Sequence, residues 1–211
     1  MKILLKIIVI MLLVIAGILA LTLIPSPQPD GPKPWEITMQ GDGEIKVLDI
    51  HLGQDTYRDA QQRWREIGKA ALFVEDGEVA TAEVFFDRIH LSGMSAKIVA
   101  NLQLPVATLN EIAANASSSK LQPSGARRLE IAFDDQALLL DAPIIAITYL
   151  ANYRPDEEML LSRFGEPDKI TGDPDDPEAA IWHYPASHLS IRLHPEDKPV
   201  FVYKARSTFS R

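Results

Sequence analysis

The residues of this chain best suited to chemistry are histidines near its C-terminus. Imidazole titrates close to neutral pH and is a common metal ligand. His188 and His194 flank an apolar run, Leu189–Leu193, that is typical of a strand, and His183 lies on the preceding predicted strand. The three rings are therefore weak candidates for a metal-assisted hydrolase. The alternative is that they are ordinary half-exposed strand and turn residues, and zinc titration by calorimetry would decide between the two.

An acidic segment, Asp173–Glu178, is the second cluster that invites a chemical interpretation. Hard cations such as Ca²⁺ prefer several carboxylate ligands. The segment lacks the glycine and the ligand spacing of a helix–loop–helix calcium site. Its prolines instead favour an exposed, solvated loop over residues 171–178.

Other catalytic signatures are missing from the sequence. The chain contains no cysteine, which excludes disulfides, thiolate zinc sites, iron–sulfur clusters and thiol catalysis. It has no Gly-x-Ser-x-Gly nucleophile elbow, no phosphate-cradling glycine loop and no dinucleotide fingerprint. We therefore predict no catalytic residues, no cofactor and no nucleotide partner, and we expect a non-enzymatic protein.

The charge of the chain bears on its partners. The formal net charge of the 211 residues is −8. Because two of the 21 basic residues, Lys2 and Lys6, lie in the first 24 positions with no acid, the remainder carries −10. A domain this negative repels phosphate backbones and anionic lipid headgroups, which argues against a nucleic-acid partner.

The N-terminus carries the clearest single signal in the sequence. Residues 7–24 hold no charge and are long enough to span about 30 Å of hydrocarbon. Residues 1–24 are predicted to be a transmembrane signal anchor that Pro25 ends. Lys2 and Lys6 place the N-terminus in the cytoplasm and the domain on the far side of the membrane. The alternative, a cleaved signal peptide, would give a mature start at Gly17 or Leu21.

Residues 25–34 are predicted to be a proline-rich linker. Five prolines in ten residues favour extended polyproline II of roughly 30 Å. The linker either lifts the domain off the bilayer or simply stops the anchor helix. Gly17, with Ala16 and Ala20, gives the anchor a small-residue patch suited to helix packing, so an accessory subunit of a larger membrane complex is a further hypothesis.

Residues 35–211 are predicted to form one α+β domain of antiparallel sheet with short helices on one face. A hairpin around Asp42–Gly43 precedes a helix over residues 57–67, which Gly68 ends. A three-stranded meander follows up to residue 104. Residues 108–116 are predicted to be helical, residues 117–125 to be a loop, and residues 127–133 and 144–150 to be strands.

The last quarter of the chain repeats this plan. A helix that begins at Arg154–Pro155 ends at Gly165, and strands are predicted over residues 180–184, 189–193 and 200–203. Two related halves, residues 35–125 and 126–211, would explain the repetition. Helix-plus-meander is a common combination, however, so duplication and coincidence both stay open.

The second copy resembles a known module. The run from Met159 to Asp168, the segment Ile181–Pro185 and the strand Val200–Tyr203 are similar to small bacterial envelope proteins, namely the BamE-type lipoprotein of the outer-membrane assembly machine and the tandem β-lactamase inhibitor proteins. The resemblance covers residues 153–205 and, more faintly, 52–104. It implies a binding or scaffolding role and carries over no catalytic residue. A membrane helix replaces the acylated cysteine of the lipoprotein, which puts an outer-membrane location in doubt.

Aromatic residues are the remaining functional lead. Most aromatic side chains serve a core. If exposed, they would be protein-contact anchors, because binding hot spots favour Trp and Tyr. The candidates for such contacts are Trp64, Trp182, Tyr184 and Tyr203. The sequence therefore predicts a membrane-anchored periplasmic protein that binds another envelope protein.

Overall fold

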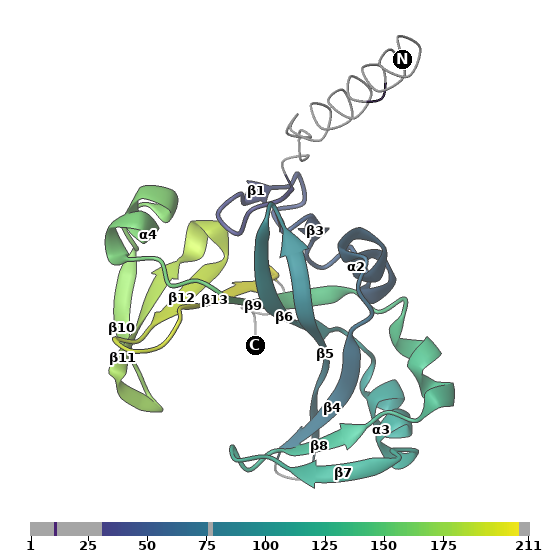
Figure 1. Cartoon of the computed structure of the whole chain (residues 1–211). Coiled ribbons are helices and arrows are strands. Elements are labelled where there is room, and N and C mark those ends of the chain that lie inside the picture. The colour runs from purple at the N-terminus through teal and green to yellow at the C-terminus, as the bar shows by residue number, and fades with distance from the viewer. Residues whose placement is uncertain (1–10, 12–30, 76–77, 207–211) are drawn as a thin grey trace, which may run out of the picture. The chain divides into compact units, whose positions relative to one another are not determined.

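The computed structural model describes residue 11 and residues 31–75 and 78–206 (Figure 1). The predicted anchor, apart from residue 11, and residues 25–30 of the predicted linker lie outside the described residues. Among the described residues, no helix has both the length and the apolar character to cross a membrane. The chain divides into residues 1–30 and a compact unit of residues 31–211, and all labelled elements of Figure 1 belong to the second.

A ten-stranded antiparallel sheet dominates residues 31–211, in the order β10-β11-β12-β13-β9-β6-β5-β4-β8-β7. Its strands are β4 (Lys69–Glu75), β5 (Glu78–Leu91), β6 (Met94–Leu102), β7 (Ser118–Leu121), β8 (Arg127–Glu130), β9 (Ile144–Ala151), β10 (Lys169–Asp173), β11 (Asp176–Tyr184), β12 (Leu189–Leu193) and β13 (Val200–Lys204). A separate small sheet contains β1 (Thr38–Met39), β2 (Ile45–Val47) and β3 (Ile50–His51). The predicted α+β class with antiparallel sheet is confirmed.

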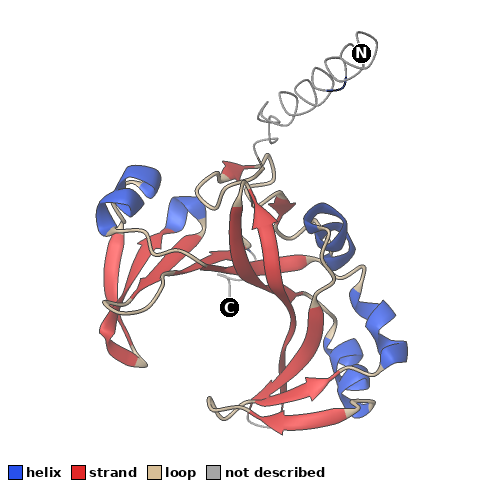
Figure 2. Cartoon of the chain, in the orientation of Figure 1, coloured by secondary structure: helices blue, strands red, loops and turns tan. Residues whose placement is uncertain are grey.

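The helices are short and lie on one side of the large sheet, as Figure 2 shows. They are α2 (Tyr57–Trp64), α3 (Val106–Ala114), α4 (Glu157–Phe164) and the 3₁₀ turns η1 (Phe133–Leu139) and η2 (Pro185–Ser187). Helix α2 ends earlier than predicted, because Arg65 adopts the left-handed conformation that stops a helix. Helix α4 ends at Gly165, as predicted.

The core lies between these helices and one face of the sheet. Residues paired directly across neighbouring strands share a face, and one such row crosses six strands and is buried throughout. The row contains Phe86, Ile98, Tyr149, Phe201, Ile191 and Trp182. Trp64 of α2 packs edge-on against Phe86, and Phe164 of α4 packs against Phe201. Both helices therefore cover the same face.

The order of the strands shows how the two helix-plus-meander segments meet in the large sheet. Strands β4, β5 and β6 lead inward to β9, and β10, β11 and β12 lead inward to β13, so that β9 and β13 pair at the centre. Strand β8 pairs with β4 and belongs to the first segment. The predicted boundary after residue 125 is therefore misplaced, because it cuts the β7–β8 hairpin; strand pairing divides the halves between β9 and α4.

Two predicted loops are hairpins. Residues 118–121 form edge strand β7, although their serines favoured a loop, because β8 supplies the ladder of hydrogen bonds. The predicted acidic loop over residues 171–178 is mostly strand, since β10 and β11 pair up to Asp173 and Asp176. In both places, pairing with a neighbouring strand overrides the local preference of polar residues and prolines.

Candidate interaction surface

The four aromatic residues predicted as contact candidates are buried, with at most 7% of each side chain exposed. The Trp64 indole donates to the Leu48 carbonyl at 2.9 Å, and the Tyr184 hydroxyl donates to the Gly165 carbonyl at 3.0 Å. The Tyr203 hydroxyl donates to the Pro34 carbonyl at 2.7 Å, and burial raises the pKa of Tyr203 well above its usual value. These residues, Trp182 included, are core residues, and a partner cannot reach them.

Two of the three candidate histidines line one cavity, and the third lines another. His183 stands opposite Ser190, with its ring nitrogens 2.9 Å from the Thr171 hydroxyl and 3.4 Å from the Ser190 hydroxyl. His183 and His188 line one shallow cavity of about 250 Å³. His194 is four residues further along the chain than Ser190, roughly 13 Å in a strand, and its side chain lines a different cavity. The structure thus brings two of the three candidates together.

His194 has a structural role in its turn. Its Nδ1 accepts backbone N–H bonds from Glu196 and Asp197, both at 3.1 Å. A nitrogen that accepts two such bonds carries no proton, so the neutral ring holds its proton on Nε2. That nitrogen lies 3.6 Å from a carboxylate oxygen of Asp176.

The acidic segment is held by an arginine. Arg192 of β12 donates to Asp173 and Asp176, the two residues where the β10–β11 hairpin closes. The hydrogen bond from Arg192 holds the pKa of Asp173 below its usual value. Within the described ranges, no group of three or more His, Cys, Asp or Glu side chains could hold a metal ion.

The face of the sheet opposite the helices carries a second row of paired residues, called here the open face. No described helix covers it (Figure 2). The row contains Lys69, Phe85, Val99, Thr148, Val202, Ser190, His183 and Lys169. Its six central side chains are half-buried, whereas Lys69 and Lys169 at its ends are exposed. The row thus has three apolar residues, Phe85, Val99 and Val202, near its middle and a lysine at each end.

Some lysines on the open face pair with a carboxylate and others do not. Lys97 pairs with Asp87 at 3.1 Å and lies 5.8 Å from the centre of the Phe85 ring. Lys69, Lys169 and Lys204 form no ion pair with any described residue. The register places Lys204 in the row beside Thr148 and Val202, so all three lysines stand on the same face. In a chain with net charge −8, a face with three unpaired cations is distinctive.

The open face is hollowed beside β4. A cavity of about 340 Å³ there is lined by Lys69, Ala71, Phe73, Glu83, Phe85, Val99, Gln122 and Arg128. Lys69 and Arg128 also line a larger groove of about 730 Å³ on the edge of the same strand. The two hollows therefore meet at these two basic residues.

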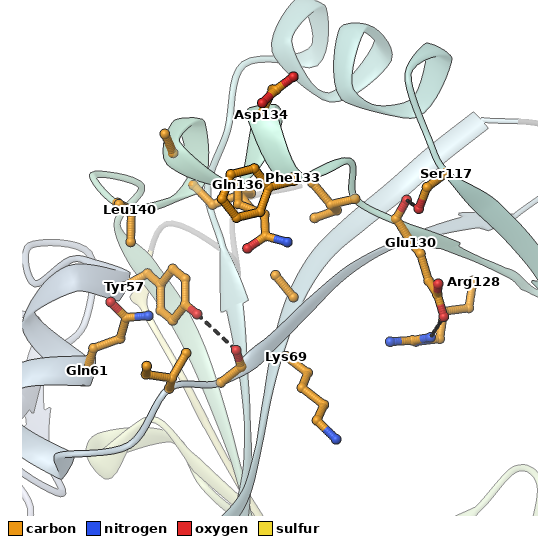
Figure 3. A pocket seen from close by; sticks show the side chains of 16 residues that line it. Tyr57, Gln61, Lys69, Ser117, Arg128, Glu130, Phe133, Asp134, Gln136 and Leu140 are labelled. Carbon is orange, nitrogen blue, oxygen red and sulfur yellow. Dashed lines mark hydrogen bonds and ion pairs between the residues drawn. The ribbon is translucent and has the colours of Figure 1, made fainter.

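The larger groove runs between α2 and η1, as Figure 3 shows. Tyr57 and Gln61 line it from α2, and Phe133 and Gln136 line it from η1. The Tyr57 hydroxyl donates to the Gly68 carbonyl at 3.1 Å. Phe133 is 86% exposed, which is unusual for a phenylalanine.

The polar groups of this groove are suited to binding a chain or a surface. Arg128 pairs with Glu130 at 3.4 Å, and the Ser117 hydroxyl donates to the Glu130 carbonyl at 3.2 Å. No histidine lies among the lining residues of the groove to activate that serine. Sequence patterns missed both hollows, because the exposure of Phe133 and the alignment of Lys69 with Lys169 depend on strand order. The only sequence signal was the polar–apolar alternation of Thr81, Ala82, Glu83 and Val84 in β5.

In comparisons with known proteins, no family model, curated protein or solved structure matches this chain.

Proposed function

We propose that this protein is a periplasmic interaction module, tethered to the bacterial inner membrane by residues 1–24, that binds another envelope protein through the open face. The observation that carries the proposal is the uncovered sheet face, on which Phe85, Val99 and Val202 lie between lysines that form no ion pair with a described residue. Contact of half-buried Phe85, Val99 and Val202 with a partner would remove their remaining apolar surface from water and favour association. The resemblance of residues 153–205 to envelope binding modules points the same way.

The partner is a protein with an acidic surface. Lys69, Lys169 and Lys204 make no ion pair within the described residues, so a carboxylate-bearing partner would neutralise them. The acidic remainder of the domain would repel the same partner elsewhere and direct it to this face. The groove of Figure 3 extends the contact area past β4.

Site-specific photocrosslinking in cells tests the proposal. When benzoyl-phenylalanine replaces Phe85 or Val202 on the open face, irradiation is expected to give a covalent adduct with a partner protein. The adduct should form only when the protein is in its membrane. The same probe in place of exposed Gln62 on α2 is the matched control. Mass spectrometry of the adduct should map the contact to a segment of the partner with more acidic than basic side chains.

Charge reversal decides whether the adduct reflects specific binding. Lys69→Glu with Lys169→Glu should abolish the crosslink, whereas Lys198→Glu, at an exposed site between β12 and β13, should leave it intact. Equal adducts at positions 62 and 85, or an adduct that survives the double reversal, would refute binding through this face.

The anchor is tested separately, because it lies outside the described residues. Sequencing the N-terminus of the protein from membranes should return Met1 or Lys2. A start at Gly17 or Leu21 would show that the segment is a cleaved signal peptide.

A further inference from the structure

We propose that the domain rests on the bilayer through a defined surface, the linker-side patch of Trp35, Met94, Tyr153, Met159 and Arg163, and that its ligand is the zwitterionic phospholipid surface. This inference rests on the proposed anchor. It adds to it a second, direct contact between the folded domain and lipid.

The first argument is where the linker meets the domain. The Ser92 hydroxyl donates to the Gly31 carbonyl, at the turn between β5 and β6. A Cβ at position 31 would lie only 2.9 Å from the Ser92 nitrogen, so this close approach suits glycine. Buried Tyr203 holds the Pro34 carbonyl at 2.7 Å. Residues 31–34 of the predicted linker are thus part of the folded domain.

The second argument is reach. The predicted membrane helix ends at Ile24, and the domain begins at Gly31. Whatever its conformation, the chain between these two residues spans at most about 25 Å, at ~3.3–3.6 Å per residue. The predicted 30 Å spacer is therefore an overestimate, and this tether allows the surface around Gly31 and the Ser92–Gly93 turn to reach the lipid headgroups.

The third argument is the chemistry of that surface. The linker-side patch lines a cavity of about 490 Å³ beside the Ser92–Gly93 turn. Met159 is 44% exposed, and Trp35, Met94 and Tyr153 are half-buried. Tryptophan and tyrosine concentrate at membrane interfaces, because their rings are apolar at one end and polar at the other. Methionine adapts its flexible chain to irregular apolar surroundings.

The patch also offers a phosphate ligand. The Arg163 guanidinium lies 4.7 Å from the centre of the Trp35 ring and forms no ion pair with a described carboxylate. Its N–H donors can therefore bind a lipid phosphate in the bidentate manner that arginine favours. Glu36, Glu157 and Glu158 are exposed nearby in the chain, and they disfavour a membrane of net negative charge. A zwitterionic surface supplies phosphate groups for Arg163 without the net negative charge that the glutamates would repel.

Fluorescence in vesicles tests the inference on the full chain, whose lack of cysteine allows single-site labelling. Met94→Cys and Met159→Cys carry an environment-sensitive dye, and exposed Lys120→Cys on edge strand β7 is the control. In phosphatidylcholine vesicles with a nitroxide-labelled lipid, we expect blue-shifted and quenched emission at 94 and 159 and neither effect at 120. Arg163→Gln should lower the quenching at 94 and 159, and added phosphatidylglycerol should lower it too.

The outcomes separate the two proposals. If the chain floats with vesicles but dyes at 94, 120 and 159 respond alike, the anchor stands and the lipid contact is refuted. If the chain does not float with vesicles, the anchor itself fails. Circular dichroism of each labelled variant confirms that the domain is folded before quenching is compared.

Discussion

In the first half of the sheet, helix α2 places Trp64 edge-on to Phe86, with ring centres 5.0 Å apart. In the second half, helix α4 places Phe164 against Phe201 and Tyr184, with ring centres 5.7 and 6.1 Å apart. Each helix thus ends in an aromatic residue that packs on aromatic residues of the helix-covered face. The shared requirement is a large apolar contact at the last turn, where a short helix has few other residues to bury.

The glycines after these helices differ in their role, although their sequence contexts look alike. Gly68 has an ordinary backbone, but a Cβ there would collide with Val84 and come within 3.0 Å of the Phe86 ring. Gly165 has open space around its Cβ position, but its φ of 78° and ψ of −173° suit glycine alone. One half needs glycine for close approach and the other needs it for backbone conformation. A glycine after the helix in each half is therefore no evidence that the two halves are equivalent.

The largest expected effect concerns the junction of the halves. Phe201→Ala removes a buried ring that contacts Tyr149 across the central β9–β13 pair, and should cost about 3–5 kcal/mol. Trp64→Ala, within the first half, should cost a similar amount. Because β9 pairs with both β6 and β13, both variants should unfold in one urea transition. A second transition in either variant would show that the halves are separate folding units.

The two glycines should respond differently to a second substitution. Gly68→Ala should cost about 1–3 kcal/mol through overpacking, and Gly165→Ala about 1–3 kcal/mol through backbone strain. Adding Val84→Ala provides room beside position 68, so the double variant should be more stable than the sum of its single variants. The same addition to Gly165→Ala should be additive. Urea unfolding of the six proteins, namely the parent chain, the three single variants and the two double variants, checks this. Equal coupling free energies in the two double-mutant cycles would show that the two glycines do not differ in role.

Much of the fold was predictable because its signals are local. The Gly165 stop and the apolar residues of β12 and β13 depend on neighbouring residues, and the end of α4 and both strands lie where they were predicted. Helix α4 begins later than predicted, at Glu157 after the Asp156 cap, and not at Arg154–Pro155. Strand β7 and the β10–β11 hairpin escaped prediction because their polar residues and prolines favour loops, whereas strand pairing within the sheet sets their conformation. In addition, Arg192 lies far along the chain from Asp173 and yet holds that residue in its strand. The candidate surface escaped for the same reason, since strand order alone brings Lys69 and Lys169 onto one face.

Alkaline pH should act through buried tyrosines of both halves, and through Tyr184 more than through Tyr57. Burial raises the pKa of Tyr184 to about 12, and that of Tyr57 in the first half is raised by burial as well. The unfolded chain loses these protons first, near pH 10. Stability is therefore unaffected at lower pH and should fall as pH rises from about 10 to 12. Tyr184→Phe should flatten that fall more than Tyr57→Phe, and equal slopes in urea titrations at pH 9–11.5 would contradict this ranking.

The smallest expected effects come from the two helix caps. The Thr56 hydroxyl accepts from the Asp59 backbone, while the Asp59 carboxylate accepts the Thr56 N–H at 2.8 Å. Asp156 caps α4 with a single acceptor bond from Met159 at 2.7 Å.

Thr56→Ala keeps the Asp59 bond, because that bond goes to the backbone, so it should cost less than the roughly 1 kcal/mol expected for a lost cap. In α4 no reciprocal bond remains when Asp156→Ala removes the cap. The substitution also removes a negative charge from the positive end of the helix dipole, so it should lower the free energy of unfolding by at least about 1 kcal/mol. Asp156→Asn retains the acceptor and isolates the charge contribution. Unfolding free energies that place Thr56→Ala above Asp156→Ala would show that the reciprocal bond gives α2 no advantage over α4.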